Sequence, residues 1–256
     1  ECGRCAVSLT WHRGPQLLRC HYCDLVRALP GACPDCGQGE LGLLGQGTER
    51  VEDALRLLFP AARVARLDRD TAGGRGLGDV LAAMRDGKLD ILVGTQMVTK
   101  GHDFPAVTLV GVLAADAGLA FPDFRAAERT FQLLAQVAGR AGRGRRPGRV
   151  LVQTWNPEAT CLQAVSRHDH AAFATEELAL RKAIGFPPYT HAVSIRLDAR
   201  SPEDVESTAK ALGAALRDRN GPAGEVNVRG PAPAPLERIR GRTRWSSTST
   251  AAAGCW

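Results

Sequence analysis

Short apolar segments alternate with amphipathic ones through the middle of the chain. Apolar segments with the length of strands are Val64–Leu67, Ile91–Val93, Thr108–Leu113 and Val150–Thr154, and segments with apolar residues at helical spacing are Leu77–Arg85 and Arg125–Ala138. Strands separated by helices predict a parallel sheet with helices on both faces. Because Thr108–Leu113 is almost wholly apolar, we expect it to be a buried strand.

The alternation weakens towards the carboxyl end. Ala171–Ile184 has a helical pattern, and Ala192–Leu197 alternates like a half-buried strand. Ser201–Leu216 is predicted to be a helix, with Ser201 as its N-cap and acidic residues in its first turn. This change of pattern predicts a second, smaller domain that begins near Pro187.

Composition changes this picture little. Of the 256 residues, 44% are hydrophobic and 23% are charged, which excludes a wholly disordered chain. No apolar run approaches the roughly 18 residues of a membrane span. The net charge of +6 permits a polyanionic partner, and an aromatic content of 5% argues against broad base-stacking surfaces.

Cysteine spacing gives the first chemical signal. Six of the eight cysteines form three C-x-x-C pairs, namely Cys2/Cys5, Cys20/Cys23 and Cys33/Cys36. Two such pairs complete a tetrahedral four-thiolate zinc site of the closed, structural kind. Spacing alone leaves open whether Cys20 and Cys23 share an ion with the first pair or with the third. Because three pairs supply more than four ligands, we expect a fourth pair upstream of Glu1.

A set of disulfides is the alternative for these cysteines. The rest of the chain carries only Cys161 and Cys255, whereas disulfide frameworks belong mainly to small secreted proteins. We therefore favour a metal site, and we expect Cys255 to be a surface thiol without a role.

A second signal follows a predicted strand, in the sequence GTQMVTKGHDFP of residues 94–105. Ligands of open parallel sheets bind at the carboxyl ends of strands, which is where this segment lies. Gly94 and Gly101 would let a phosphate approach the backbone closely. Lys100 supplies a cation, and Asp103 supplies an acceptor suited to a ribose hydroxyl. The alternative is an ordinary Gly- and Thr-rich turn.

The third signal is QVAGRAGR, residues 136–143. Arg140 and Arg143 are three positions apart, so they share one helix face or one helix end. Small residues around them leave room for a triphosphate, whose growing charge two guanidinium groups would stabilise. The alternative is a solvated basic helix end that continues through Arg145, Arg146 and Arg149. That alternative does not explain the paired glycines, which cost about 1 kcal/mol each within a helix.

The second and third signals resemble motifs five and six of the superfamily-two helicases, and the sixth has the pattern Q-x-x-G-R-x-G-R. Together with the C-x-x-C pairs, the segments GTERVEDALRLLFP, LDRDT, GFPPY and GPAPAPLERIRGR occur in an order that resembles the PriA family of replication-restart DNA helicases. The resemblance runs from Cys2 to about Trp245. It implies an α/β fold, in which a RecA-like parallel-sheet helicase lobe carries an amino-terminal Cys-rich zinc module and a partial small α+β carboxyl-terminal domain.

The resemblance also implies a division of the chain. Residues 1–40 would form the zinc module, 41–186 the second RecA-like lobe and 187–245 the partial carboxyl-terminal domain. Residues 246–256 lack apolar alternation, so we expect a disordered tail there. The chain contains neither G-x-x-x-x-G-K-[ST] nor a D-E-x-H-like acidic box. Because the family carries both in its first lobe, we expect a carboxyl-terminal fragment that is inactive by itself.

The zinc ligands are implied in the same way. In the family, four interleaved C-x-x-C pairs hold two zinc ions. This pattern implies one complete site formed by Cys2, Cys5, Cys20 and Cys23. Cys33 and Cys36 would bind the other ion with the upstream pair.

The motor residues follow from the matching motif positions. Arg140 and Arg143 would contact the ATP γ-phosphate, with Arg143 as the arginine finger. Gln136 would orient the nucleotide or the attacking water, and the ATP site would also include Gly101 and Asp103. Contacts with the DNA backbone are implied for Thr95, Gln96 and Lys100, and a position near the DNA-facing edge of the lobe for Asp68 and Arg69.

The implied function is that of an ATP-dependent DNA helicase that restarts stalled replication forks and initiates primosome assembly. Its cofactors would be Zn²⁺ and, in the intact enzyme, ATP with Mg²⁺. Its partners would be forked or single-stranded DNA, the single-strand-binding protein and other primosome proteins, in the bacterial cytoplasm near the nucleoid and away from any membrane. One alternative is a non-catalytic DNA-binding primosome scaffold that has lost ATP hydrolysis. A second is an RNA helicase, which the cysteine pattern disfavours.

Overall fold

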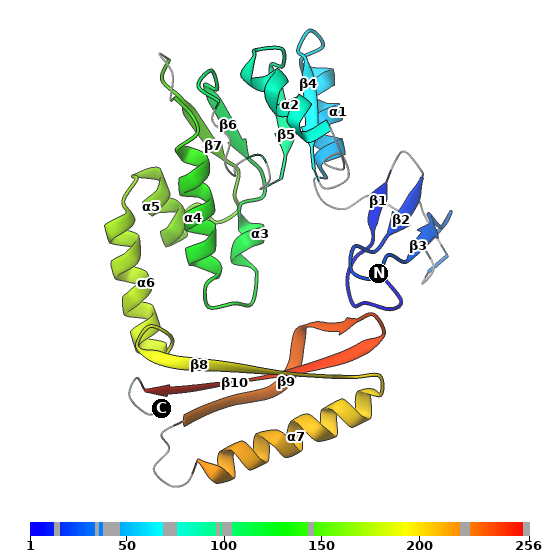
Figure 1. The fold of residues 1–256 in the computed structure, drawn as a ribbon, viewed down its shortest axis with the longest axis vertical. Helices are drawn as coiled ribbons and strands as arrows, with labels where there is room; N and C mark the ends of the chain where they lie inside the picture. The colour runs from blue at the N-terminus through cyan, green and yellow to red at the C-terminus, as the bar shows by residue number, and fades with distance from the viewer. Residues whose placement is uncertain are drawn as a thin grey trace. The chain divides into compact units, whose positions relative to one another are not determined.

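The computed structural model describes residues 1–12, 16–33, 36–37, 47–68, 76–95, 98, 104–142, 146–220 and 226–252. The chain divides into two compact units, one formed by Glu1–Leu43 with Leu178–Trp256 and the other by Leu44–Glu177 (Figure 1). The first unit therefore joins the cysteine-rich segment to the carboxyl-terminal domain, two regions that we expected to be separate. None of the described helices is long and apolar enough to cross a membrane.

The cysteine-rich segment folds around a small antiparallel sheet. Its strands, in the order β1-β2-β3, are β1 (Thr10–His12), β2 (Leu17–Arg19) and β3 (Val26–Ala28). Trp11 pairs with Leu18, and Leu18 with Arg27. Three-residue strands bury little apolar surface, so the segment needs a further source of stability, such as a bound metal ion.

The second unit begins with two parallel strands and two helices. In chain order its elements are α1 (Thr48–Leu58), β4 (Val64–Leu67), α2 (Gly76–Arg85) and β5 (Ile91–Gly94). Strands β4 and β5 run parallel, with Val64 beside Ile91. Leu67, Leu81 and Phe104 are buried in one apolar cluster, which holds α2 against the strands.

A second pair of parallel strands forms the rest of this unit. Its elements are β6 (Leu109–Val112), α3 (Asp116–Leu119), α4 (Ala126–Ala138), β7 (Arg149–Val152), α5 (Thr160–Ser166) and the first part of α6 (His170–Ile184). The apolar face of α4 places Phe131 and Leu134 in a buried cluster with Leu162 and Phe173. The rings of Phe131 and Phe173 stack with their centroids 4.2 Å apart. This cluster is the main apolar core of the unit.

The parallel strands confirm the α/β fold class, but the expectation of a buried strand at β6 was wrong. Leu109 is 57% exposed and Leu113 is 47% exposed. Burial alternates along β6 because the strand is covered on one face, where Val112 packs against the core cluster. In the described part of the chain, β4–β5 and β6–β7 are two separate two-stranded sheets rather than one continuous sheet.

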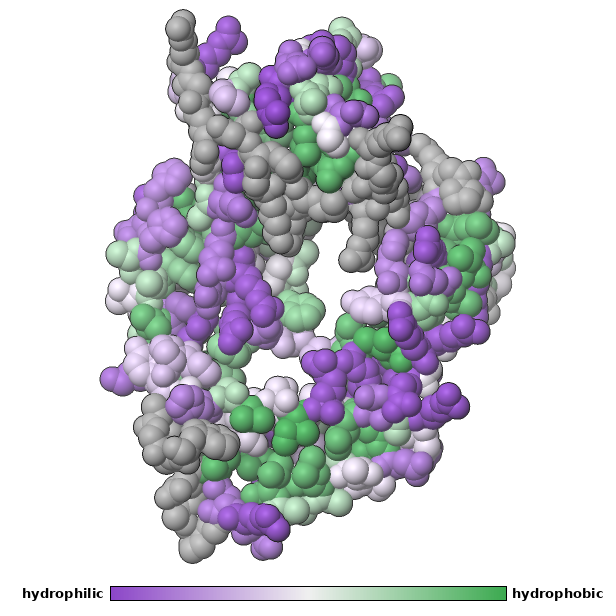
Figure 2. Space-filling model, viewed as in Figure 1, coloured by the Kyte–Doolittle hydropathy of each residue, from purple (hydrophilic) through white to green (hydrophobic). Residues whose placement is uncertain are grey.

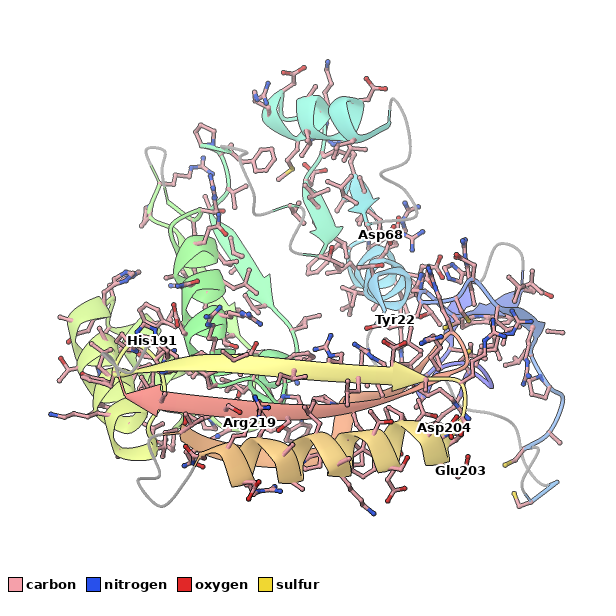
Figure 3. The ribbon with its side chains drawn as sticks, turned by 60° about the horizontal axis from the view of Figure 1, so that its bottom comes forward. Tyr22, Asp68, His191, Glu203, Asp204 and Arg219 are labelled. Carbon is pink, nitrogen blue, oxygen red and sulfur yellow. The ribbon has the colours of Figure 1, made fainter. Side chains whose placement is uncertain are left out.

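The carboxyl-terminal domain is an antiparallel sheet with one long helix packed on it. Its elements are β8 (Thr190–Ala199), α7 (Pro202–Arg219), β9 (Val226–Ile239) and β10 (Arg242–Ala252), and the strand order is β8-β10-β9. As predicted, Ser201 caps α7, because its Oγ accepts a hydrogen bond from the Asp204 N–H at 3.0 Å. Glu203 and Asp204 in the first turn and Arg219 in the last suit the helix dipole (Figure 3). Figure 2 shows hydrophobic residues gathered where the sheet meets α7.

The expectation of a disordered tail was wrong for residues 246–252. They form most of β10, the central strand, in which Ser246 lies beside Arg196 on one side and Ala232 on the other. The Ser247 hydroxyl donates to the Arg229 carbonyl at 2.9 Å. A central strand is stabilised by hydrogen bonds along both edges, so it does not require apolar alternation. Residues 253–256 lie outside the described residues.

Candidate metal centre and motor residues

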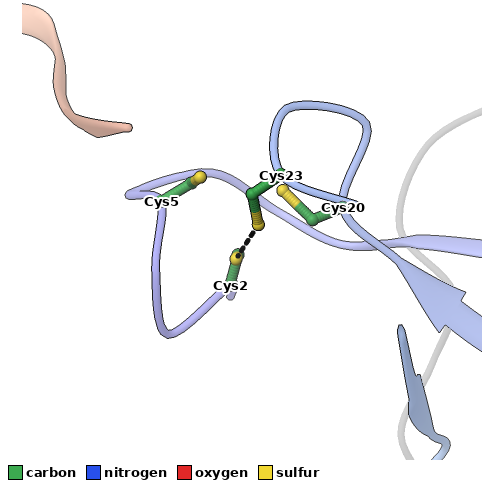
Figure 4. A group of neighbouring side chains, drawn as sticks. All are labelled: Cys2, Cys5, Cys20 and Cys23. Carbon is green, nitrogen blue, oxygen red and sulfur yellow. Dashed lines mark hydrogen bonds between the residues drawn. The ribbon is translucent and has the colours of Figure 1, made fainter. Parts of the chain in front are cut away.

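Four cysteines converge from two loops of the cysteine-rich segment. Cys2 and Cys5 come from the loop before β1, and Cys20 and Cys23 from the loop after β2 (Figure 4). Their sulfur atoms all lie within 4.8 Å of one another, and the Sγ atoms of Cys2 and Cys23 are 3.6 Å apart. Tetrahedral zinc with Zn–S bonds of about 2.3 Å places its sulfurs roughly 3.8 Å apart. The group therefore has the size and the donor atoms of a closed four-thiolate zinc site.

Hydrogen-bonded turns fix the backbone around each of the two cysteine pairs. The Cys5 N–H donates to the Cys2 carbonyl at 3.2 Å, and the Asp24 N–H donates to the Cys20 carbonyl at 2.9 Å. The Arg4 N–H donates to Cys2 Sγ at 3.4 Å. Cys2, Cys5 and Cys20 are buried, so an ion held by them would be shielded from water. Backbone N–H groups directed at sulfur are a common outer shell of such sites, because they orient the ligands and tune the metal.

The metal-free thiols resist ionising together. Burial raises the pKa of the Cys2 thiol, but hydrogen bonds from the Arg4 N–H and from neighbouring cysteines outweigh it and bring that pKa to about 7. Burial raises the pKa of Cys5. A backbone hydrogen bond from Leu25 lowers the pKa of Cys23, yet burial and the adjacent thiols raise it to about 12. Because one thiolate disfavours the next, a divalent cation is what allows all four to be ionised.

The third C-x-x-C pair is not part of this group. Among the described residues, the cysteines close enough to hold one ion are Cys2, Cys5, Cys20 and Cys23. Cys33, which is half-buried, and Cys36, which is exposed, are not among them. Of the two pairings that spacing left open, the geometry therefore favours the first pair with the second. Cys161 lies in the core of the other unit, where burial raises its pKa.

The arginine motif lies at the end of α4. The helix is capped by Gly139, and Gln136 is exposed in its last turn. Arg140 is half-buried in the turn that follows, where its N–H donates to the Val137 carbonyl at 2.9 Å. Both polar side chains thus come from the same end of the helix.

The structure shows a backbone reason for Gly142 to be glycine. Its φ is 76°, in the left-handed region that favours glycine. A Cβ at this position would lie 2.5 Å from the amide nitrogen of Gly148. The Gly142 N–H donates to the Val107 carbonyl at 3.1 Å. The glycine therefore lets two backbone segments cross, and the room for a triphosphate that we expected from the small residues stays a prediction.

Several candidate motor residues lie outside the described residues, namely Arg69, Gln96, Lys100, Gly101, Asp103 and Arg143. Thr95 is described, and it is exposed just beyond β5. A Cβ on Gly94 would lie 2.6 Å from the Leu67 carbonyl oxygen. The close backbone approach at Gly94 is thus to the neighbouring strand β4.

Asp68, which we expected near a DNA-facing edge, is buried at the end of β4 (Figure 3). Its carboxylate accepts a hydrogen bond from Thr48 Oγ at 2.7 Å and lies 3.1 Å from the Arg66 guanidinium. Arg66 also pairs with Glu49 at 3.0 Å and with Glu52 at 3.2 Å, both on α1. This network ties α1 to β4, so Asp68 has a structural role here.

Sequence reasoning missed one residue at the metal centre. Arg240 occupies the turn between β9 and β10, and its N–H donates to Cys5 Sγ at 3.1 Å. Gly241 suits a turn between two strands, although Arg-Gly is not among the dipeptides that usually mark a two-residue hairpin. Nothing in the sequence indicates, however, that this turn meets a loop 235 positions away.

Three family models match the chain in an order that follows its architecture. They are the PriA DNA helicase Cys-rich region (CRR) domain at residues 2–27, the helicase conserved C-terminal domain at residues 44–145 and the primosomal protein N C-terminal domain at residues 182–252. The first match contains all four converging cysteines, and it ends before Cys33.

Curated relatives match the chain along nearly its full length. It is 42% identical over 246 residues to the replication restart protein PriA of Bacillus subtilis (strain 168) and 44% identical over 250 residues to that of Synechocystis sp., and each match covers 96% of this chain. The corresponding protein of Haemophilus influenzae is 39% identical over 246 residues. The chain spans about 30% of the length of the first two relatives. By these matches and by its zinc-competent cysteine group, the chain belongs to the PriA family of replication restart proteins.

Proposed function

We propose that this chain supplies the second motor lobe, the zinc module and the carboxyl-terminal domain of an ATP-dependent DNA helicase that restarts stalled replication forks and initiates primosome assembly. The observation that carries the proposal is the order of the three matched domains on one chain. The helicase domain alone would indicate only a motor, whereas the two flanking domains are named for primosomal proteins. The protein would act in the bacterial cytoplasm near the nucleoid, with the single-strand-binding protein and other primosome proteins as partners.

For ATP, the proposed site is a cleft that a first lobe completes. Arg143 would be the arginine finger, Arg140 would contact the γ-phosphate and Gln136 would orient the attacking water. The support for this assignment is that Gln136 and Arg140 leave the same end of α4. Gly101 and Asp103 would complete the site on this lobe. ATP with Mg²⁺ supplies the phosphoryl group, and the part of this chain is to position it and to neutralise its charge.

For DNA, the proposed path runs past the turn that carries Thr95, Gln96 and Lys100. Thr95 is exposed at the carboxyl end of β5, where ligands of parallel sheets bind. The chain has a net charge of +6 and only 5% aromatic residues, so phosphate contacts would dominate over base stacking. Binding should therefore depend strongly on salt and little on sequence.

A chimera tests the ATPase proposal. In it, this chain replaces the matching region of the Bacillus subtilis relative, so that both motor lobes are present. DNA-stimulated ATP hydrolysis is expected, and Arg143→Ala should lower turnover about 10³-fold, the usual scale for an arginine finger. Arg146→Ala, at a nearby exposed arginine, is the matched control and should change turnover little. An Arg143→Ala chimera that keeps its turnover would contradict the role of Arg143, and an inactive chimera would favour the non-catalytic scaffold.

Fluorescence anisotropy with forked DNA at two salt concentrations tests the proposed DNA path. Combining Thr95→Ala with Lys100→Ala should weaken binding measurably. Combining Arg145→Ala with Arg146→Ala should change it by less than about 1 kcal/mol, the scale of exposed charge pairs. The reverse ranking would mean that DNA runs along the arginine-rich turn instead.

A further inference from the structure

The turn between β9 and β10 meets both cysteine loops of the candidate zinc site. The Arg240 N–H donates to Cys5 Sγ at 3.1 Å, and Arg240 Nε donates to the Tyr22 carbonyl at 2.8 Å. Tyr22 lies between Cys20 and Cys23, so one residue of the carboxyl-terminal domain bonds to both halves of the site. Figure 1 shows this turn next to the start of the chain.

Backbone hydrogen bonds on either side of Arg240 reinforce the contact. The Gly241 N–H donates to the Arg4 carbonyl at 2.6 Å, and the Ala6 N–H donates to the Arg238 carbonyl at 3.0 Å. The side chain of Ile239 packs against the buried cysteine cluster. The loop of the first cysteine pair and the hairpin turn thus hold each other by polar and apolar contacts together.

The backbone conformation of the turn gives independent support. Arg240 has a φ of 53° and Gly241 a φ of 76°, so both residues of this two-residue turn are left-handed. Glycine, asparagine and aspartate are the usual residues at the first of these positions, because a larger side chain is strained there. An arginine that is kept at a strained position and bonds to both cysteine loops indicates that its side chain has a function there, namely to hold the second cysteine loop.

The chemistry of the site explains what these donors do. Four thiolates around one Zn²⁺ leave two excess negative charges. N–H groups that donate to sulfur disperse this charge and fix the orientation of the ligands. Within the described residues the Arg4 N–H serves Cys2 in this way, and the Arg240 N–H serves Cys5 from another domain.

We propose that the β9–β10 turn is an outer-shell part of the zinc centre, with Arg240 as its positioning residue. Zinc binding and docking of the carboxyl-terminal domain on the cysteine-rich segment then stabilise each other. Loss of zinc releases the hairpin turn, and loss of the turn speeds the release of zinc. This coupling lies beyond the motor function proposed above, and it can be tested without any ATPase or helicase assay.

The first test is zinc release to a chromogenic chelator from the whole chain. Arg240→Gly keeps the backbone N–H that donates to Cys5 Sγ and suits the left-handed backbone, but it removes the side-chain bond to the Tyr22 carbonyl, which holds the second cysteine loop. It should therefore speed zinc release about 10-fold, the scale of outer-shell effects on metal sites. The same change should leave the thermal stability of the zinc-free domain equal or higher, because strain is relieved. If Arg240 had a merely structural role, the variant would release zinc faster and its zinc-free domain would also be less stable. Arg242→Ala is the control, because Arg242 bonds to Asp198 within its own domain; it should lower stability and hardly change zinc release.

The second test is hydrogen exchange of the unmodified chain, which needs no variant to fold. With zinc bound, the amides of Ala6, Arg240 and Gly241 should be protected. Chelation should abolish that protection, and added zinc should restore it. Zinc release from Arg240→Gly at the wild-type rate, or equal protection of the turn with and without zinc, would overturn the proposal.

Discussion

The turn beyond α4 allows a sharp test of why QVAGRAGR carries two glycines. Gly142 has a φ of 76°, where any residue with a Cβ costs roughly 1–2 kcal/mol. A Cβ would also lie 2.5 Å from the nitrogen and 3.1 Å from the Cα of Gly148. Both are backbone atoms that no rotamer change can move, and such overpacking adds about 1–3 kcal/mol. Gly142→Ala should therefore destabilise the lobe by about 2–5 kcal/mol.

Gly139→Ala is the matched control within the same motif. Gly139 has a φ of −68°, which alanine adopts without strain. A Cβ there would meet its nearest neighbours, the Ala135 and Gln136 carbonyl oxygens, at 3.5 and 3.6 Å, which are ordinary contacts. Alanine also restricts the unfolded chain, so this variant should be unchanged or more stable by up to about 1 kcal/mol.

Urea denaturation can measure the stability of both variants, provided that the probe reports on the unit that contains α4. Because the chain has two compact units, the amides of α4 should be followed by hydrogen exchange during the titration. Equal losses of unfolding free energy in Gly142→Ala and Gly139→Ala would refute the backbone explanation. If Gly142→Ala kept full stability but abolished ATP turnover in the chimera, the glycine would serve the triphosphate, as the sequence first indicated.

Other features of the structure yield further expectations. Leu134→Ala should cost about 2–5 kcal/mol of unfolding free energy in the same assay, because Leu134 is 2% exposed in the core cluster; a loss below that range would mean that the cluster is loosely packed. The Arg63 guanidinium and N–H hold the pKa of the Asp90 carboxyl well below its usual range, so this pair stabilises the fold above about pH 4 and loses that effect as the pH falls. Melting temperatures of Asp90→Asn should therefore lie below those of the wild type at about pH 7, and the gap should begin to narrow only below about pH 4 and continue to shrink as the pH falls further; a gap that stays constant on acidification would contradict the assignment. Elemental analysis after mild chelation should find about one zinc per chain, and Cys33→Ser should leave that ion in place, whereas Cys20→Ser should remove it.

Local patterns were sufficient where local interactions decide the structure. The strand Val64–Leu67 was predicted with the bounds that β4 has, and the bounds of α2 and α4 each differ from the prediction at one end by one residue. Gly87 lies two positions after α2 and has a φ of 69°, which no continuing helix would adopt. Helical periodicity and such stop signals act over a few residues, so a single sequence carries them.

Strand β10 could not be predicted, because its stability is not local. Its residues from Ser246 to Thr250 are serine and threonine throughout, which resembles a polar tail. The strand forms because β8 and β9 supply hydrogen bonds along its two edges and α7 packs on the sheet. Likewise, the contact of Arg240 with Cys5 depends on where a distant hairpin is placed. Both features arise from tertiary contacts, which the local sequence pattern does not predict.

The expectation for Cys33→Ser depends on the sheet rather than on the cysteine motif, because the second and third C-x-x-C pairs show the same backbone hydrogen bond. The Asp24 N–H donates to the Cys20 carbonyl at 2.9 Å, and the Gly37 N–H donates to the Cys33 carbonyl at 2.8 Å. The two pairs therefore share the same i to i+4 hydrogen bond. A hydrogen bond that both pairs share cannot determine which pair completes the site with the first one.

The register of the antiparallel strands does determine which cysteine pair completes the site with the first one. The first strand begins at Thr10, which lies opposite Arg19 at the end of the second, so a pair before β1 and a pair after β2 emerge at the same end of the sheet. The third strand returns along the second and ends at Ala28, which lies opposite Leu17. Chain that leaves β3 therefore starts from the other end of the sheet, away from the first two pairs. Removing a thiol of the third pair should then leave the bound zinc in place, and a Cys33→Ser variant that lost its only tightly bound zinc would show that the ion is held across the sheet, against this register.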